Sequence, residues 1–321
     1  MGDEGGSFDA RQGSPPDREE VRRVKRLSNG QVVHGRYQVL SFLGRGSFAR
    51  VYLTNDQRWR GNLVALKEIP TGHYSEQEYA QFNAHFLREA AFLMQLQHPG
   101  LPRVVEFFAE GSNYYLALEW VPGHTLEQEL QQRDSPAEGE VIGWGLQLAE
   151  VLRYLHSQRP YPVMLGDLKP ANVVLDYQGR LRVVDFGVAS YAVPDQKREF
   201  ALVSPGFSAP EQYLSGQLDE RCDIYALGAT LYWTLYPCAL DRFRFDVPSI
   251  RKFRPDVSNG FDELLTRCLH TDPQLRPYPA EEVILALRGT FQRLGSLQQA
   301  TSSPAEILSK LYRDRKKKFD F

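Results

Sequence analysis

The sequence predicts an α+β fold in which a small β-rich part is followed by a larger, mainly helical part. β-branched and aromatic residues are concentrated in five short segments before residue 119, namely 37–43, 49–53, 63–67, 104–108 and 114–118. Later in the chain, apolar residues recur at helical spacing, as in Val141, Trp144, Leu148, Val151, Leu152 and Leu155. Strands that precede helices along a chain are typical of α+β proteins.

The composition is that of a soluble globular protein, because 42% of the 321 residues are hydrophobic and 24% are charged. A net charge of −2 provides no overall field that would attract nucleic acid, so no nucleic-acid partner is expected. The three cysteines, Cys222, Cys238 and Cys268, form no C-x-x-C pair, which argues against a disulfide framework or a zinc site. A reducing cytosol is the simplest setting, and we predict a cytoplasmic location.

The first 36 residues are predicted to form a disordered N-terminal extension. Residues 1–30 are rich in Gly, Pro, Ser and charge, a composition that buries too little apolar surface to fold. Between the first two predicted strands, Gly44-Arg45-Gly46-Ser47 is typical of a tight turn. Glycines let a backbone approach a phosphate closely, although a plain hairpin turn has the same signature.

Lys67 stands at the end of the predicted strand 63–67 and needs an acidic partner to be held in one place. A capping box at Ser75-Glu76-Gln77-Glu78 predicts that a helix starts there, and apolar residues at helical spacing continue it to Met94. Glu89 lies toward the apolar side of this helix, where an unpaired carboxylate would be costly. Lys67 is therefore the candidate partner of Glu89.

The most informative stretch of the chain holds two polar groups at the ends of a predicted hairpin. Asp167-Leu168-Lys169-Pro170-Ala171-Asn172 precedes the strand 173–175, and Asp185-Phe186-Gly187 follows the strand 181–184. A turn at residues 176–179 would bring the two groups together. Two carboxylates, an amide and an ammonium make a poor core but a good site for phosphate and for Mg²⁺, which prefers oxygen ligands.

The later part of the chain contains further start signals for helices. Residues 125–128 and the pair Ser208 and Glu211 fit the capping-box pattern, and residues 135–138 announce a longer helix. The uncharged run 224–240 is too short to span a membrane, so we expect a buried core helix and no transmembrane segment. Residues 296–321 end in a basic run and are expected to be a solvated C-terminal extension.

D-L-K-P-A-N followed by D-F-G resembles the catalytic core of the eukaryotic-type (Hanks-type) Ser/Thr protein kinases. Other motifs of the family match in the expected order between about residues 37 and 290. They are the Gly44-x-Gly46 turn with Ala49 as its third position, Val64-Ala65-Leu66-Lys67, Glu119-Trp120-Val121-Pro122-Gly123, Ser204 to Glu211, and Asp272 to Pro277. The sequence Ala209-Pro210-Glu211-Gln212 and the L-K-P-A-N motif resemble bacterial members in particular.

The resemblance implies a two-lobed kinase-like domain at residues 37–295, with an N-lobe at 37–118, a hinge at 119–123 and a C-lobe at 124–295. Asp167 would orient and deprotonate the incoming hydroxyl, and Lys169 would neutralise charge on the γ-phosphate. Lys67 with Glu89 would set the α and β phosphates. Asn172 and Asp185 would hold Mg²⁺.

The family also implies which residues contact ATP and which hold the C-lobe together. The expected nucleotide-binding set is Leu43, Gly44, Gly46, Ser47, Val51, Ala65, Lys67, Glu119 and Val121, with Leu118 as the gatekeeper. Glu211 would form a buried ion pair with Arg276. Asp223 would accept hydrogen bonds from the catalytic-loop backbone, and Ser204 would lie near Asp167 and Lys169.

One departure from the family is informative, because Leu165-Gly166-Asp167 stands where the family has His-Arg-Asp. Leu165 can replace the His as packing against Phe186. The missing Arg normally pairs with a phosphate on the activation loop, a contact that Gly166 cannot make. We therefore hypothesise that activity does not require activation-loop phosphorylation.

The expected function is Mg-ATP-dependent transfer of the γ-phosphate to Ser and Thr hydroxyls of protein substrates, including the chain itself by autophosphorylation. The alternative is a pseudokinase that acts as a nucleotide-binding scaffold or regulatory module, for which Leu165-Gly166 and Ala49 are the support. A small-molecule kinase of similar fold is less favoured, because the segment 204–211 matches the part of protein kinases that shapes the peptide site.

Overall fold

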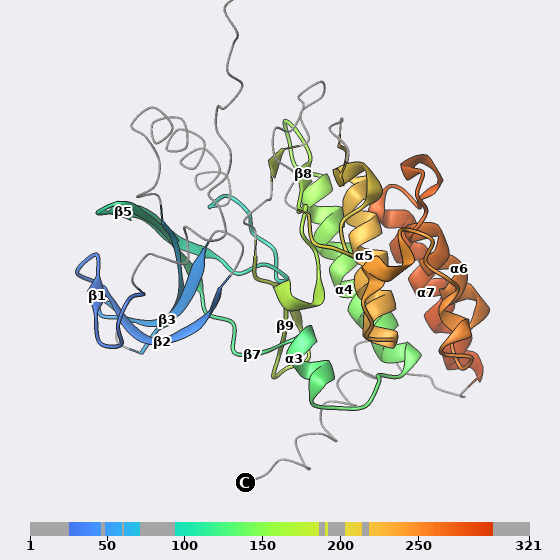
Figure 1. Ribbon diagram of the computed structural model, residues 1–321, viewed down its shortest axis with the longest axis horizontal. Coiled ribbons are helices and arrows are strands. Elements are labelled where there is room, and N and C mark those ends of the chain that lie inside the picture. The colour runs from blue at the N-terminus through green and yellow to red at the C-terminus, as the bar shows by residue number, and fades with distance from the viewer. Residues whose placement is uncertain are drawn as a thin grey trace, which may run out of the picture. The chain divides into compact units, whose positions relative to one another are not determined.

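The computed structural model describes residues 26–45, 49–59, 61–70, 94–185, 190–191, 203–213 and 218–297 (Figure 1). The chain divides into two compact units, each of which is described by itself. The first unit comprises the chain up to Leu96 together with Arg103–Trp120, and the second comprises Gln97–Pro102 and the chain from Val121 onward. Within the described ranges, every helix is too short or too polar to cross a membrane.

The first unit is built on a six-stranded antiparallel sheet with the order β1-β2-β3-β4-β6-β5. Its strands are β1 (Val32–Val33), β2 (Tyr37–Arg45), β3 (Arg50–Asp56), β4 (Leu63–Pro70), β5 (Val104–Glu110) and β6 (Asn113–Glu119). All five strands predicted from the sequence are therefore present. The helix expected after Ser75, including Glu89, lies outside the described residues.

Burial alternates along β4, so the two faces of the sheet have different roles. Val64 and Leu66 lie in the hydrophobic core of this unit, together with Val33, Tyr37, Val39, Tyr52, Tyr115 and Ala117. Ala65 and Lys67 are half-buried on the opposite face, because successive side chains of a strand point to opposite sides. The lysine singled out in the sequence is thus on the face of the sheet away from this core.

The N-terminal extension was expected to be disordered as far as residue 36, and for residues 26–36 this expectation is wrong. β1 pairs with β2, and Val33 is only 2% exposed within the core. Arg36 is buried and binds Asp56 through two hydrogen bonds of 2.9 and 2.6 Å. These residues are part of the folded unit because they cover apolar surface of the sheet. Residues 1–25 lie outside the described residues.

The second unit contains the helices α3 (Leu126–Gln131), α4 (Glu138–His156), α5 (Arg221–Leu235), α6 (Asn259–Cys268) and α7 (Ala280–Leu297). Its strands are β7 (Gly123–Thr125), β8 (Val163–Met164), β9 (Val173–Asp176), β10 (Leu181–Val183) and β11 (Ser190–Tyr191). They form a β10-β9-β7 sheet and a β11-β8 pair. Short 3₁₀ helices are η1 (Pro170–Asn172), η2 (Pro210–Tyr213), η3 (Leu240–Phe243), η4 (Ile250–Lys252) and η5 (Pro273–Leu275).

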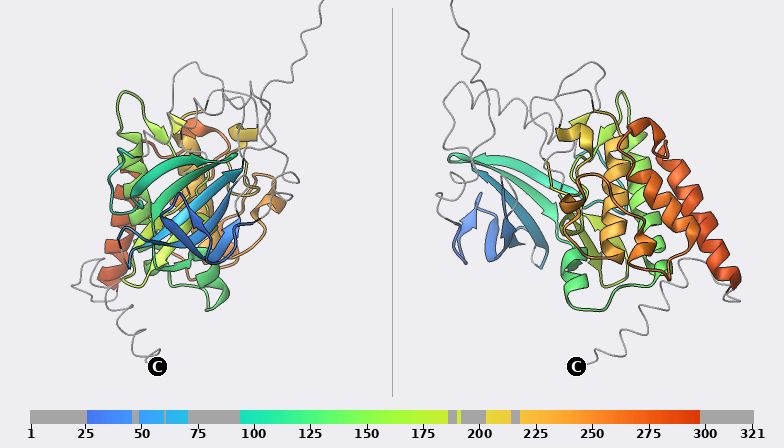
Figure 2. Two further views of the ribbon diagram at one scale, coloured as in Figure 1. Left: turned by 90° about the vertical axis from the view of Figure 1, so that its left-hand side faces the viewer. Right: turned by 45° about the vertical axis from the view of Figure 1, so that its right-hand side comes forward.

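The long helices of the second unit pack side by side, with α4 against α5 and α7 and with α6 against α5 and α7 (Figures 1 and 2). The predicted buried core helix is present as α5, which is buried along most of its length and ends at Leu235. The capping box at Thr125 is also confirmed. The longer helix predicted from residues 135–138 is present as α4; its N-cap residue is Ala137, and the Ser135 hydroxyl donates to the Leu235 carbonyl.

Candidate active site

A hairpin brings the segment 167–172 and Asp185 to the same place, as the sequence predicted. β9 and β10 pair in antiparallel register, with Val173 opposite Val183. Just beyond the strands, the Val184 amide donates to the Asn172 carbonyl at 2.9 Å. Asp185 follows at once, so Asn172 and Asp185 lie at the same end of the hairpin.

Asp167 is held by three side chains that donate hydrogen bonds to its carboxylate. The Lys169 ammonium lies 2.7 Å from Oδ2, and the Asn172 amide nitrogen lies 3.0 Å from the same oxygen. The Ser204 hydroxyl donates to Oδ1 at 2.6 Å and itself accepts from Lys169 at 2.7 Å. Ser204 therefore lies where the sequence predicted it, between Asp167 and Lys169.

This arrangement suits the orientation of a hydroxyl group and the binding of anionic oxygens. The carboxylate of Asp167 is fixed yet partly exposed, so it can accept a proton from an incoming group. The Lys169 ammonium beside it can offset negative charge on a phosphate. Asn172 uses its amide nitrogen for Asp167, which leaves the amide oxygen as a ligand for a cation. Together with the carboxylate of Asp185, which lies at the same end of the β9–β10 hairpin, this oxygen is of the kind that Mg²⁺ prefers.

The backbone before Asp167 is held by a buried carboxylate on α5. Asp223 is 0% exposed, and it accepts from the Leu165 amide and the Gly166 amide, both at 2.8 Å. The predicted contact between Asp223 and the catalytic loop is therefore confirmed. His156, at the end of α4, places Nε2 3.0 Å from Asp223, a contact that the sequence did not reveal. Gly166 has φ +80°, a conformation that glycine adopts without a Cβ penalty.

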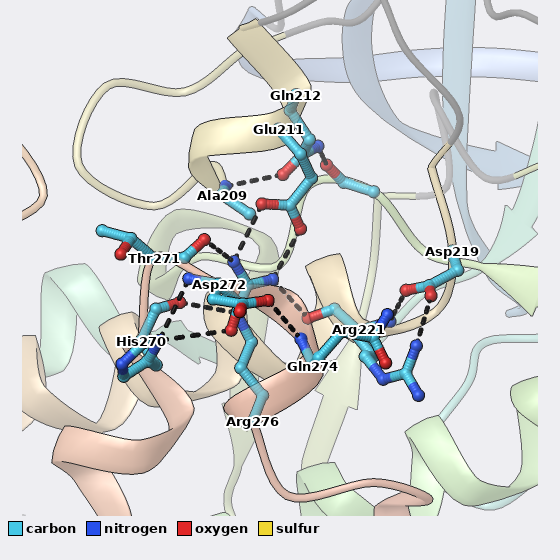
Figure 3. Close-up of polar contacts among 11 residues, drawn as sticks. Ala209, Glu211, Gln212, Asp219, Arg221, His270, Thr271, Asp272, Gln274 and Arg276 are labelled. Carbon is cyan, nitrogen blue, oxygen red and sulfur yellow. Dashed lines mark hydrogen bonds and ion pairs between the residues drawn. The ribbon is translucent and has the colours of Figure 1, made fainter.

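The ion pair between Glu211 and Arg276 is confirmed as a two-pronged contact of 2.5 and 2.8 Å (Figure 3). Arg276 also donates to the carbonyls of Arg221, His270 and Thr271. Its guanidinium lies 5.1 Å from the centre of the Tyr225 ring, and burial raises the pKa of Tyr225 to about 12. One cation thus joins η2, the first turn of α5 and the loop at residues 270–271.

The capping box predicted from Ser208 and Glu211 is wrong. The Ser208 hydroxyl accepts from the Ser204 amide at 2.8 Å, and Glu211 binds Arg276 instead of the Ser208 backbone. The local pattern fits a capping box, but the Ser204 amide, four residues earlier, binds Ser208, and the distant Arg276 binds Glu211. The segment forms the 3₁₀ helix η2.

In the first unit, several residues of the expected nucleotide-binding set share one face of the sheet. Val51 lies directly opposite Lys67 in the β3–β4 ladder, and Gly44 lies opposite Val51 in the β2–β3 ladder. Ala65 is on the same face as Lys67 and lies opposite Leu118 on β6. Leu43, next to Gly44, is 40% exposed. The structure therefore groups Val51, Ala65 and Lys67 in this unit.

The remaining residues of that set are placed less completely. The Glu119 amide donates to the Arg103 carbonyl at 2.8 Å, and Glu119 lies opposite Val64 in the β4–β6 ladder. Val121 is buried and belongs to the second unit. Gly46, Ser47 and Glu89, together with Phe186, lie outside the described residues.

Sequence reasoning missed Gln212, which is 4% exposed on η2. Its side-chain oxygen accepts from the Ala209 amide at 2.8 Å (Figure 3), and its side-chain nitrogen donates to the Gly166 carbonyl at 3.0 Å. The sequence motif drew attention to this glutamine only as a sign of bacterial relatives. Because Gly166 is 46 residues away, no local pattern could have predicted the contact.

Comparisons with known proteins agree with this geometry. A family model described as "Protein kinase domain" matches residues 37–285. Serine/threonine-protein kinase pkn2 of Myxococcus xanthus is 30% identical, over 86% of this chain and 35% of that protein. Serine/threonine-protein kinase PrkC of Bacillus subtilis is 26% identical, over 82% of this chain and 41% of that protein. The chain therefore spans less than half the length of these two relatives.

Among solved structures, the PknI kinase domain of Mycobacterium tuberculosis superimposes with a TM-score of 0.67 at 27% sequence identity. The match covers 83% of this chain and 100% of that domain. The match therefore includes residues of both the sheet-containing first unit and the mainly helical second unit. Residues 26–36, which complete the sheet, precede the region matched by the family model.

Proposed function

Because the chain belongs to the protein kinase family and resembles its bacterial Ser/Thr members, we propose that it transfers the γ-phosphate of Mg-ATP to Ser and Thr hydroxyls of proteins. The observation behind this proposal is the group around Asp167, whose carboxylate is oriented by Lys169, Asn172 and Ser204. Loss of any one of these side chains would leave the carboxylate less well fixed. All of them are present.

In the proposed reaction, the oxygen of the substrate hydroxyl bonds to the γ-phosphorus, and Asp167 accepts the proton of that hydroxyl. The bond between the γ-phosphorus and the oxygen that joins it to the β-phosphate breaks, and ADP leaves. Lys169 lies beside Asp167 and offsets the charge on the transferred group. When bound, Mg²⁺ supplies positive charge against the phosphate oxygens. Asn172 and Asp185 are the residues proposed to hold it.

The first unit is proposed to bind the nucleotide. Val51 and Ala65 offer an apolar surface next to Lys67, which is suited to the α and β phosphates. Leu43, Gly44, Gly46 and Ser47 are proposed to cover the nucleotide, and Glu89 to hold Lys67. The backbones of Glu119 and Val121 are proposed to bind adenine, as the resemblance to the family implies.

We further propose that this activity does not depend on a phosphorylated activation loop. Gly166 offers no side chain that could bind such a phosphate, and its backbone is fixed by Asp223 instead. The expected partners are protein substrates, with autophosphorylation included. The proposed location is cytoplasmic, on the argument from the cysteines.

The test uses protein that has been treated with a phosphatase, which is then removed. Incubation with Mg-ATP, followed by mass spectrometry, should show new phosphoserine or phosphothreonine, and phosphorylation of an added substrate should begin without a lag. EDTA should abolish both signals. A lag that disappears after preincubation with Mg-ATP would contradict independence from phosphorylation.

The second candidate is a pseudokinase that binds nucleotide as a scaffold. Leu165-Gly166 and Ala49 favour it, because they replace residues that the family uses. This candidate predicts Mg-ATP binding by calorimetry without any transfer. Transfer that requires Asp167 would exclude it.

A further inference from the structure

Gln212 joins the two loops that meet at Asp167. Its amide group is buried and uses its oxygen for the Ala209 amide and its nitrogen for the Gly166 carbonyl. The Gly166 carbonyl belongs to the peptide group that leads directly into Asp167. The Ala209 amide belongs to the turn that begins at Ser204, whose hydroxyl binds the carboxylate of Asp167.

Both ends of this bridge are anchored elsewhere in the second unit. On the Gly166 side, the preceding amides donate to Asp223, which lies on a fully buried part of α5. On the η2 side, the neighbouring Glu211 is fixed by Arg276 (Figure 3). Gln212 therefore fixes the Gly166 peptide relative to the Ala209 segment, because a shift of either segment would break one of its hydrogen bonds.

We propose that Gln212 is a positioning residue that holds Asp167 in register with Ser204 and so provides, without a phosphate, the order that a phosphorylated loop would otherwise supply. This inference rests on the proposed kinase function. The requirement is for one donor and one acceptor on the same planar group, which a primary amide has. Gly166 has φ +80°, a conformation that costs free energy for a residue with a Cβ atom, and its carbonyl accepts from this donor.

The sharpest variant is Gln212→Glu. An ionised carboxylate still accepts from the Ala209 amide, but its second oxygen faces the Gly166 carbonyl and leaves that acceptor without a donor. A protonated carboxyl group restores the donor. The expected result is a fall in kcat of about tenfold at pH 8 relative to the wild type, with KM for ATP changed by less than about twofold.

The ratio of variant to wild-type kcat should then rise as the pH falls toward 5.5, because burial favours the protonated form of the introduced group. Gln292→Glu, on the exposed side of α7, is the matched control and should show a flat ratio near one. A flat and reduced ratio for Gln212→Glu would mean a merely structural role and would overturn the proposal. A ratio that stays near one would overturn it as well.

A second measurement does not depend on phosphate transfer. Hydrogen exchange of Gln212→Ala should accelerate at least about tenfold at the amides of Leu165, Gly166 and Ala209, while amides of α6 keep their wild-type rates. Unchanged exchange at these three amides would overturn the bridge. If the wild type transfers no phosphate, the kinase proposal fails and the positioning role fails with it, whereas the exchange result still decides whether the bridge holds the loop. If Gln212→Ala does not fold, the pH ratio of Gln212→Glu decides.

Discussion

Ser204 donates its hydroxyl to Asp167, with Oγ 2.6 Å from Oδ1. The same hydroxyl accepts from Lys169, so one small side chain fixes both the carboxylate and the ammonium of the candidate active site. Its amide is in turn fixed by Ser208. Hydrogen bonds therefore connect the turn that holds Ser204 to the proposed chemistry.

Removal of this hydroxyl should lower the rate of phosphate transfer. Ser204→Ala takes away a hydrogen bond to a charged group, which is worth about 1.5–3 kcal/mol, so kcat should fall roughly 10- to 100-fold. Ser204→Thr keeps the hydroxyl and should retain activity within about fivefold. Steady-state kinetics measure both, with Thr266→Ala on the surface of α6 as the control. Equal losses in the Ala and Thr variants would contradict the role of the hydroxyl.

Asp223→Asn should destabilise the second unit. The introduced amide would place a nitrogen donor against one of the two backbone donors, Leu165 or Gly166, in a site that excludes water. A buried donor without a partner costs about 1–3 kcal/mol, and the lost charge adds to this, so the free energy of unfolding should fall by roughly 3 kcal/mol. Urea denaturation measures the change. A loss of less than about 0.5 kcal/mol would show that the contact contributes little.

Arg276→Met should be among the most destabilising substitutions in the second unit. It would leave the Glu211 carboxylate and the Arg221, His270 and Thr271 carbonyls without their donor. Removing one partner of a buried ion pair costs roughly 3–5 kcal/mol. Arg276→Lys keeps the charge but loses the fork, and should give an intermediate loss. The control is Arg288→Met, whose pair with Glu150 is exposed and should cost less than about 1 kcal/mol.

The buried pair of Arg36 and Asp56 predicts a pH dependence of stability for the first unit. Hydrogen bonds from Arg36 hold the pKa of Asp56 below its ordinary value. The ionised carboxylate therefore stabilises the fold above the unfolded pKa of about 4, and this contribution is lost as the pH falls through the lowered pKa. Between pH 6 and pH 3, the wild type should lose more stability than Arg36→Met, as urea denaturation at each pH would show. Parallel curves would contradict the account.

The hairpin and the ion pair of Glu211 with Arg276 could be predicted from the sequence for different reasons. The hairpin follows from short strands around a turn, which is local information. The ion pair followed only from a resemblance to a family, because nothing near Glu211 in the sequence points to Arg276. The resemblance to a family therefore predicted the long-range contacts, and the periodicity of apolar residues predicted the helices and strands.

Contacts that depend on distant partners outside known motifs were not predictable. β1 has only two residues, too few to show a periodicity, and the polar composition of the preceding residues predicted disorder. The burial of Val33 and Arg36 was therefore not predictable. Ser208 and Glu211 match a local capping pattern, yet Ser208 binds the nearby Ser204 amide and Glu211 binds Arg276, which is 65 residues away. In both cases the deciding free energy came from packing and pairing in the folded unit, which a short window of sequence does not contain.

The most direct test of the central claim is transfer of labelled γ-phosphate from Mg-ATP to a generic basic protein, with the wild type compared with Asp167→Asn. The wild type should transfer label, and the substitution should reduce the rate at least about a thousandfold, since it removes the proton acceptor while keeping the shape of the side chain. Both proteins should still bind Mg-ATP in calorimetry. Equal transfer by the two proteins, or binding without transfer by the wild type, would contradict the assignment of a catalytic role to Asp167.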